Sequence, residues 1–141
     1  MPEDDAGARE RPTVRVVLQR HRNRIIEYLE VAASFDDQQE YERNVQIVHV
    51  PYEVINQWED WFPKDPRHNF DFLDVYDAAE VDAVCQFQVA WEAAADALSD
   101  DYPPLSEVQA LPEWEQLRSA AEVALTVFMK RGMMPEDHEV A

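Results

Sequence analysis

Glycine is almost missing from this chain. Two of the 141 residues are glycine, where average usage of about 7 % would give roughly ten. Glycine-rich phosphate loops, type I′ hairpins and tight β-sandwich corners all need glycine, because their backbones adopt positive φ. This scarcity favours helices joined by turns that contain proline.

Cysteine and long apolar runs are scarce as well. Cys85 is the one cysteine, so the chain can form no internal disulfide, and a reducing compartment is expected. The opening residues, MPEDDAGARERP, are charged and do not resemble a secretory signal. No run reaches the roughly 18 apolar residues of a membrane span. We therefore predict a cytoplasmic protein that has no membrane partner.

Positive charge is the third scarcity. Twelve basic residues face 30 acidic ones, which gives a formal charge of −18, and only Lys64 and Lys130 are lysines. DNA and anionic membranes would repel such a surface, whereas a basic protein would be attracted to it. An acid-rich, lysine-poor surface also suits a salt-adapted cytosol. Composition leaves both interpretations open.

The chain does contain clear helical periodicity, and 46 % of its residues are apolar. Apolar residues recur at steps of three and four in four segments, which we predict to be helices. A shorter helix and a single turn are predicted between them, whereas IVHVP before the third helix reads as extended, because the residue before a proline disfavours α backbone. The predicted helices cover about 14–33, 37–46, 51–62, 78–98 and 112–131, and the turn covers 106–109.

Capping residues mark the ends of these segments. Thr13 precedes the first helix, Asp36 or Asp37 the second, and Asp77 forms a capping box with Glu80. Gly132 follows the last helix, as expected for a C-terminal cap. The sequence thus predicts an all-α fold, a compact irregular bundle of about five helices. One domain is expected over 13–132, after a disordered leader (1–12) and before a flexible tail (133–141).

In the first predicted helix, the apolar stripe and the arginines occupy different faces. Arg15, Arg20, Arg22 and Arg24 lie mostly off the stripe. The stripe consists of Val14, Val17, Leu18, His21, Ile25, Tyr28, Leu29 and Ala32.

Acidic residues at three-residue intervals first suggest a metal site in FDFLDVYDAAEVDAV, residues 70–84. A calcium loop instead needs acids at alternating positions and a glycine, and zinc needs clustered cysteine and histidine. Steps of three on a helix turn by about 300°, so the acids would fan out rather than converge. We predict no metal site and no cofactor.

Catalytic signals are weak. Cys85 lies on the apolar stripe of the helix predicted over 78–98 and is interpreted as a small buried hydrophobe. A reactive cysteine would need a cationic neighbour, and no lysine or arginine lies between Arg67 and Arg118. We predict no catalytic residue. The alternative is a small enzyme or ligand-binding domain that uses carboxylates and His49, which lies close to Glu53.

Six arginines fall within sixteen residues, from Arg9 to Arg24, and Glu10 is the one acid among them. Alone, this would suggest a helix that binds nucleic acid. Because the rest of the chain is strongly negative, we expect these arginines to meet acids of the same fold or of a second copy. Direct nucleic-acid binding is not predicted, and a homodimer remains open.

The fifty residues between Arg67 and Arg118 contain twelve acids and no base. These like charges repel one another and lower the stability of the folded chain, whereas a basic partner would be attracted to them. An aromatic and acidic cluster at residues 58–61 adds candidate interface anchors. Trp58 is predicted to lie in the core, whereas the sequence favours core and interface equally for Trp61. The predicted partner-binding surface consists of Glu59, Asp60, Trp61, Asp71, Asp74, Asp77, Glu80 and Asp82.

As a small, acidic and helical protein with aromatic residues among its acids, the chain resembles bacterial inhibitors of basic nucleases and proteins that imitate DNA. The resemblance is one of composition and implies a non-enzymatic protein that binds a basic protein partner, as inhibitor, immunity protein or DNA mimic. The alternatives are the small enzyme described above and a salt-adapted protein of housekeeping or regulatory role.

Overall fold

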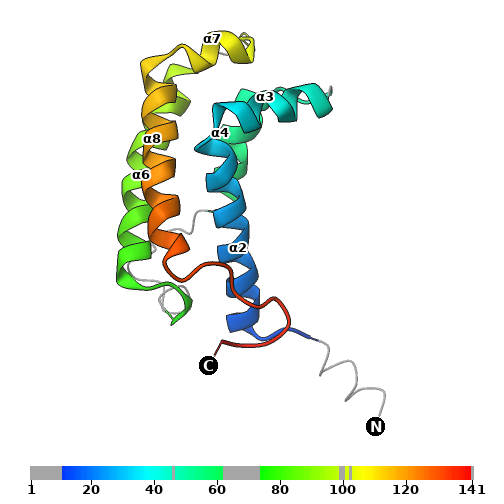
Figure 1. Cartoon of the computed structure of the whole chain (residues 1–141), viewed down its shortest axis with the longest axis vertical. Coiled ribbons are helices and arrows are strands. Elements are labelled where there is room, and N and C mark those ends of the chain that lie inside the picture. The colour runs from blue at the N-terminus through cyan, green and yellow to red at the C-terminus, as the bar shows by residue number, and fades with distance from the viewer. Residues whose placement is uncertain (1–10, 46, 62–73, 99–100, 102, 141) are drawn as a thin grey trace.

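The computed structural model describes residues 11–45, 47–61, 74–98, 101 and 103–140. In these residues the chain forms helices and no strand, which confirms the all-α prediction. Figure 1 shows α6 and α8 side by side along their length, with α2 facing them and the short α3 and α7 at one end. The helices are α2 (Val14–Ala32), α3 (Phe35–Asn44), α4 (Val50–Trp61), α6 (Ala78–Ala97), α7 (Leu105–Gln109) and α8 (Pro112–Met129).

Local capping explains where α2, α3 and α6 begin and where α8 ends. The Thr13 hydroxyl accepts the Val16 amide at 3.2 Å, at the start of α2. At the start of α6, Asp77 accepts the amide of Glu80 at 2.8 Å, and Glu80 accepts the amide of Asp77 at 3.3 Å. Gly132 has a φ of 72° and closes the turn after α8, a conformation that costs glycine little. The predicted caps at Thr13, Asp77 and Gly132 are therefore confirmed.

Two predicted boundaries were wrong. Ser34, rather than Asp36 or Asp37, caps α3, because its hydroxyl accepts the Asp37 amide at 3.1 Å and leaves both aspartates in the first turn. The stretch before α4 forms a turn and a bend at 47–48 rather than extended chain. Helix α4 begins at Val50, so Pro51 is its second residue, where its missing N–H costs nothing.

The core is centred on aromatic side chains from three helices. Tyr28 lies 5.3 Å from Trp58 and 6.0 Å from Phe87, and Trp58 and Phe87 are 4.7 Å apart between ring centroids. The hydroxyl of Tyr28 donates to the Val54 carbonyl at 2.6 Å, so burial leaves it satisfied. Trp58 has no exposed surface, which confirms its assignment to the core.

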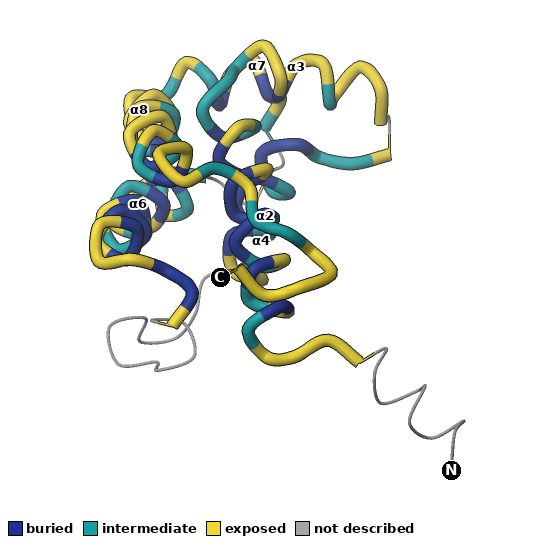
Figure 2. Tube along the Cα trace, turned by 60° about the horizontal axis from the view of Figure 1, so that its bottom comes forward, coloured by how far each residue is buried: buried dark blue, intermediate teal, exposed yellow. Residues whose placement is uncertain are grey.

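The apolar stripe predicted for α2 holds only in its C-terminal half. Val14 and Val17 are 61 % and 46 % exposed, whereas Gln19, Arg22 and Asn23 are almost fully buried. Figure 2 shows the exposed start of α2 and its buried later turns. The polar residues are buried because other parts of the fold supply their hydrogen-bond partners.

One of these parts is the C-terminal segment, residues 133–140. Gln19 donates to the carbonyls of Pro135 and His138 at 2.9 and 2.8 Å and accepts the Val140 amide at 2.9 Å. Asn23 donates to the Met134 carbonyl at 2.8 Å and accepts its amide at 2.9 Å. The predicted tail thus runs along α2 in contact with it, a placement that the sequence prediction did not include.

Candidate functional site

The residues predicted to bind a partner fall on several elements with different surroundings. Glu59 and Asp60 lie exposed near the end of α4. The side chain of Trp61 and the whole of Asp71 lie outside the described residues. Asp82 is exposed on the first turns of α6. The structure therefore brings Glu59, Asp60 and Asp82 to the surface, on two neighbouring helices.

Asp74 and Asp77 are exposed but each faces an arginine. Asp74 Oδ2 lies 3.3 Å from Nη1 of Arg15, and Asp77 Oδ2 lies 3.3 Å from Nε of Arg131. The pair of Asp74 with Arg15 agrees with the expectation that arginines of the basic segment meet acids of the same fold, whereas Arg131 lies outside that segment. Part of the acidic surface predicted from the sequence is therefore neutralised within the chain.

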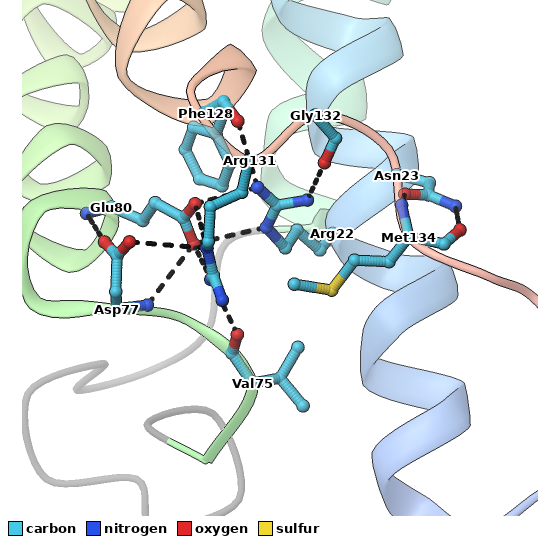
Figure 3. Close-up of polar contacts among 9 residues, drawn as sticks. All are labelled: Arg22, Asn23, Val75, Asp77, Glu80, Phe128, Arg131, Gly132 and Met134. Atoms are coloured by element: carbon cyan, nitrogen blue, oxygen red, sulfur yellow. Dashed lines mark hydrogen bonds and ion pairs between the residues drawn. The ribbon is translucent and has the colours of Figure 1, made fainter. Parts of the chain in front are cut away.

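Glu80 is removed from the surface altogether. Its side chain and that of Arg22 have no exposed area, and they form a bidentate pair at 2.7 and 3.2 Å. Arg131 donates to the same carboxylate at 2.5 and 3.1 Å. Figure 3 shows this Glu80 cluster, formed by Arg22, Asp77, Glu80 and Arg131. A carboxylate with no exposed area cannot contact a partner, so Glu80 does not belong to a binding surface.

The remaining donors of the two arginines join the Glu80 cluster to three backbone carbonyls, two at the end of α8 and one just before α6. Arg22 donates to the carbonyls of Phe128 and Gly132 at 3.0 and 2.5 Å, and Arg131 donates to the Val75 carbonyl at 2.9 Å. Both arginines and the Glu80 carboxylate are therefore used in holding α2, the start of α6 and the end of α8 together.

Electrostatics keep this carboxylate charged. Burial by itself raises the pKa of Glu80, but hydrogen bonds and charge from Arg22 and Arg131 outweigh burial and hold the pKa below its ordinary value. Donors from Asp77, Arg22 and Arg131 occupy its oxygens, which offer about four lone-pair sites. A charged, saturated carboxylate of this kind is not available as a general base.

His49 also has a structural setting. Its Nε2 lies 2.7 Å from the Pro103 carbonyl oxygen, and its Nδ1 accepts the Tyr52 amide at 3.4 Å. These contacts fit the tautomer in which Nε2 carries the proton. The imidazole thus links the start of α4 to the segment before α7.

Three exposed acids of the predicted surface, Glu59, Asp60 and Asp82, lie on α4 and α6. Neither helix contains a lysine or arginine, although together they carry seven acidic residues. The two helices contact one another, so their charges add. We call their exposed acids the α4–α6 acidic face, which consists of Glu59, Asp60, Asp82, Glu92 and Asp96.

A hollow of about 230 Å³ lies in the seam between α4 and α6, lined by Trp58, Glu59, Gln88 and Trp91. Gln88 accepts the Trp58 indole N–H at 2.7 Å and donates to Glu92 at 3.2 Å. Trp91 donates its own N–H to the Ile55 carbonyl at 2.9 Å. Trp58 lies beneath the surface, so the walls of this tryptophan hollow that reach solvent include the edge of Trp91, 9 % exposed, and the Glu59 carboxylate, a combination that suits a cationic side chain.

Other site types find little support in the described part of the chain. No group of three or more His, Cys, Asp or Glu side chains there could hold a metal ion. None of the helices described is long and apolar enough to cross a membrane. Cys85 is partly buried and packs against the hydrophobic core, in line with its interpretation as a small hydrophobe.

Comparison of the chain with protein-family models, curated proteins and solved structures finds no match. Its function must therefore be argued from the site itself. Sequence reasoning predicted Glu59 and Asp60 from the aromatic and acidic cluster at 58–61 and Asp82 from the stretch that lacks bases, and the structure exposes all three. It missed the role of Arg22, because the partner of that side chain is 58 residues away and no local pattern points to it.

Proposed function

We propose that this chain is a non-enzymatic interaction protein that binds a basic protein. The observation that carries the proposal is the α4–α6 acidic face, where two contacting helices expose only negative charge. The tryptophan hollow within this face would serve as an anchor point for a lysine or arginine of the partner.

The physical basis is charge complementarity. A negative face attracts a cationic partner over distances near the Debye length, about 10 Å in 0.1 M salt, and so speeds association. A cation that reaches the tryptophan hollow gains contact with the exposed edge of Trp91 and with Glu59. If the partner uses the same basic residues to bind nucleic acid, occupation of those residues would inhibit it, which is the DNA-mimic type of action.

The enzyme alternative finds less support. Glu80, the buried carboxylate, is saturated by donors, and both ring nitrogens of His49 are engaged with backbone groups. Salt adaptation predicts acids spread over the whole surface, and α3, with four acids in ten residues, fits that pattern. The two remaining interpretations, partner binding and salt adaptation, differ in whether the α4–α6 acidic face matters more than other acids.

The test compares two double variants that lose equal charge. A lysine-rich peptide is titrated into each protein at about 50 mM and about 500 mM NaCl by calorimetry. We expect Glu59→Gln with Glu92→Gln to weaken binding about threefold to tenfold at the lower salt. The matched control, Glu40→Gln with Glu42→Gln, removes two exposed acids of α3 and should leave affinity within about twofold. Equal losses in both proteins would show that only net charge matters and would overturn the proposal.

A further inference from the structure

We infer that the groove between α6 and α8 is the docking site for a cationic amphipathic helix of the partner. The inference rests on the proposed function and specifies the structural element that the partner presents. The groove has a volume of about 380 Å³ and is lined by Ala79, Asp82, Ala83, Gln86, Phe87, Ala120, Val123, Ala124 and Val127.

The groove exists because both helices place alanine at their line of contact. Ala83, Ala124 and the Phe87 side chain are buried and form the floor. Val123 is 58 % exposed at the rim, opposite the exposed Ala79. Apolar side chains of a partner helix that enter such a groove would bury exposed apolar surface, at about 25 cal/mol per Å².

The exposed line of α6 combines apolar and acidic side chains. Residues recur at steps of three and four along this line and so lie on one face of the helix, where alanine and valine offer apolar contact and two aspartates offer negative charge. Val89, 69 % exposed, lies in its middle. The line consists of Ala79, Asp82, Gln86, Val89, Ala93 and Asp96.

Charge on the two sides of the groove differs. On α6 every exposed charge is negative, and Asp82 and Asp96 are separated by fourteen residues, or about 21 Å along the helix. Helix α8 carries Arg118 beside its three acids, and this arginine lies 2.6 and 2.9 Å from the carboxylates of Glu115 and Glu122. A matching helix therefore carries its lysines and arginines on the flank that faces α6.

This asymmetry favours a basic partner over a second copy of the chain. Each copy carries a formal charge of −18, and packing two α6 helices close together would oppose like charges. A cationic helix would instead gain attraction along the same flank. Helix-in-groove binding of this kind is a common mode of recognition.

The probe is a synthetic helix of about three heptads, with leucine and alanine at the seam positions and lysine along one flank. A matched peptide carries glutamate in place of lysine. Binding to the full chain is measured by fluorescence anisotropy at about 50 mM NaCl. We expect the lysine peptide to bind and the glutamate peptide to bind at least tenfold more weakly, because its flank repels the α6 acids.

Three variants locate the probe. Ala79→Trp fills the groove from an exposed position and should weaken binding about tenfold. Val123→Ser removes apolar contact and should weaken binding about fivefold, while Asp82→Asn should weaken it about threefold. The control is Val14→Ser, an equally exposed valine of α2, which should leave affinity unchanged. Circular dichroism and the urea midpoint establish that each variant is folded.

The outcomes separate this inference from the proposed function. If the lysine peptide binds and Glu59→Gln with Glu92→Gln weakens binding, but Ala79→Trp and Val123→Ser have no effect, the groove is not the docking site. The proposed function then stands. If no cationic probe binds at low salt, both fail. If the chain forms a dimer that Ala79→Trp dissociates in sedimentation, the groove is a contact between copies and the inference is overturned.

Discussion

Arg22 and Glu80 are long charged side chains with no exposed area, joined by two hydrogen bonds. Removing two charges from water costs several kcal/mol per ion, and only close, well-oriented partners offset this cost. Here Arg131, the Phe128 ring and backbone carbonyls complete the surroundings. The arrangement makes loss of one partner costly, because the other would remain buried and charged.

We predict that Arg22→Met lowers the free energy of unfolding by about 3–5 kcal/mol, as expected when one partner of a buried pair is removed. The matched control is Arg15→Met, which removes an arginine whose pair with Asp74 is exposed and should cost at most about 1 kcal/mol. Urea unfolding followed by circular dichroism measures both values. Equal costs would contradict a special role for the Glu80 cluster.

The same carboxylate predicts a dependence of stability on pH. The pKa of Glu80 in the folded chain lies below its ordinary value, so its contribution to stability is complete above the unfolded pKa of about 4.3 and is lost as pH falls through the folded pKa. The difference in unfolding free energy between the wild type and Glu80→Gln should therefore be constant from about pH 7 to 5 and shrink below about pH 4.

The control for this pH series is Ile25→Val, a change in the buried core that alters no charge. Its difference from the wild type should stay the same at every pH. Urea unfolding at each pH provides the values. A Glu80→Gln difference that does not change with pH would show that the carboxylate has the same pKa in the folded and unfolded chain.

Some helices are positioned by local interactions and others by distant ones. The start of α6 is specified locally, since Asp77 and Glu80 satisfy each other's backbone amides. The buried side of α2 is specified from a distance, since the partners of Gln19 and Asn23 lie in the C-terminal segment. These two cases lead to different predictions for substitution.

Asp77→Ala should lower the unfolding free energy by about 1–2 kcal/mol, because α6 loses its N-cap. Asp77→Asn should cost less, since the amide oxygen still caps the helix and only the exposed pair with Arg131 is weakened. Asp96→Ala, an exposed change near the other end of α6, should stay within about 0.5 kcal/mol. Urea midpoints that follow a different order would contradict Asp77 as the cap.

Asn23→Ala should lower the unfolding free energy by about 1–3 kcal/mol, because the Met134 backbone loses its partners beside a buried surface. Asn44→Ala, an exposed asparagine at the end of α3, should change it by less than about 0.5 kcal/mol. Hydrogen exchange provides a second measurement. Faster exchange of the Met134 amide in Asn23→Ala than in Asn44→Ala would support the contact, and equal exchange would contradict it.

At the scale of the whole molecule, the dominant property is the charge of −18. Like charges repel, so the folded chain carries a cost that added salt screens. We predict that the urea midpoint rises when NaCl is increased from about 50 mM to about 500 mM. Glu59→Gln with Glu92→Gln should show a smaller rise, because two of the repelling charges are absent. A midpoint that falls with salt would mean that surface ion pairs outweigh repulsion.

The helices and most of their ends could be read from the sequence, because their causes are local. Apolar residues at helical spacing, a threonine or aspartate before the first turn and a glycine after the last act within a few residues of one another. Glu59, Asp60 and Asp82 were predicted from local sequence as well, and the structure exposes all three. Trp58 was assigned to the core correctly from its place on the stripe of α4.

The tertiary structure alone decided which charges are exposed. Arg22 lies off the predicted apolar stripe and Glu80 was predicted to bind a partner, yet the two are buried together across 58 residues of sequence. The pairing of Asn23 with Met134 spans 111 residues. By itself the sequence determined the helical fold and the excess of negative charge, since periodicity and composition are properties of the chain. Which acids remain available to a partner depends on packing, because only the folded chain brings distant arginines within hydrogen-bond reach.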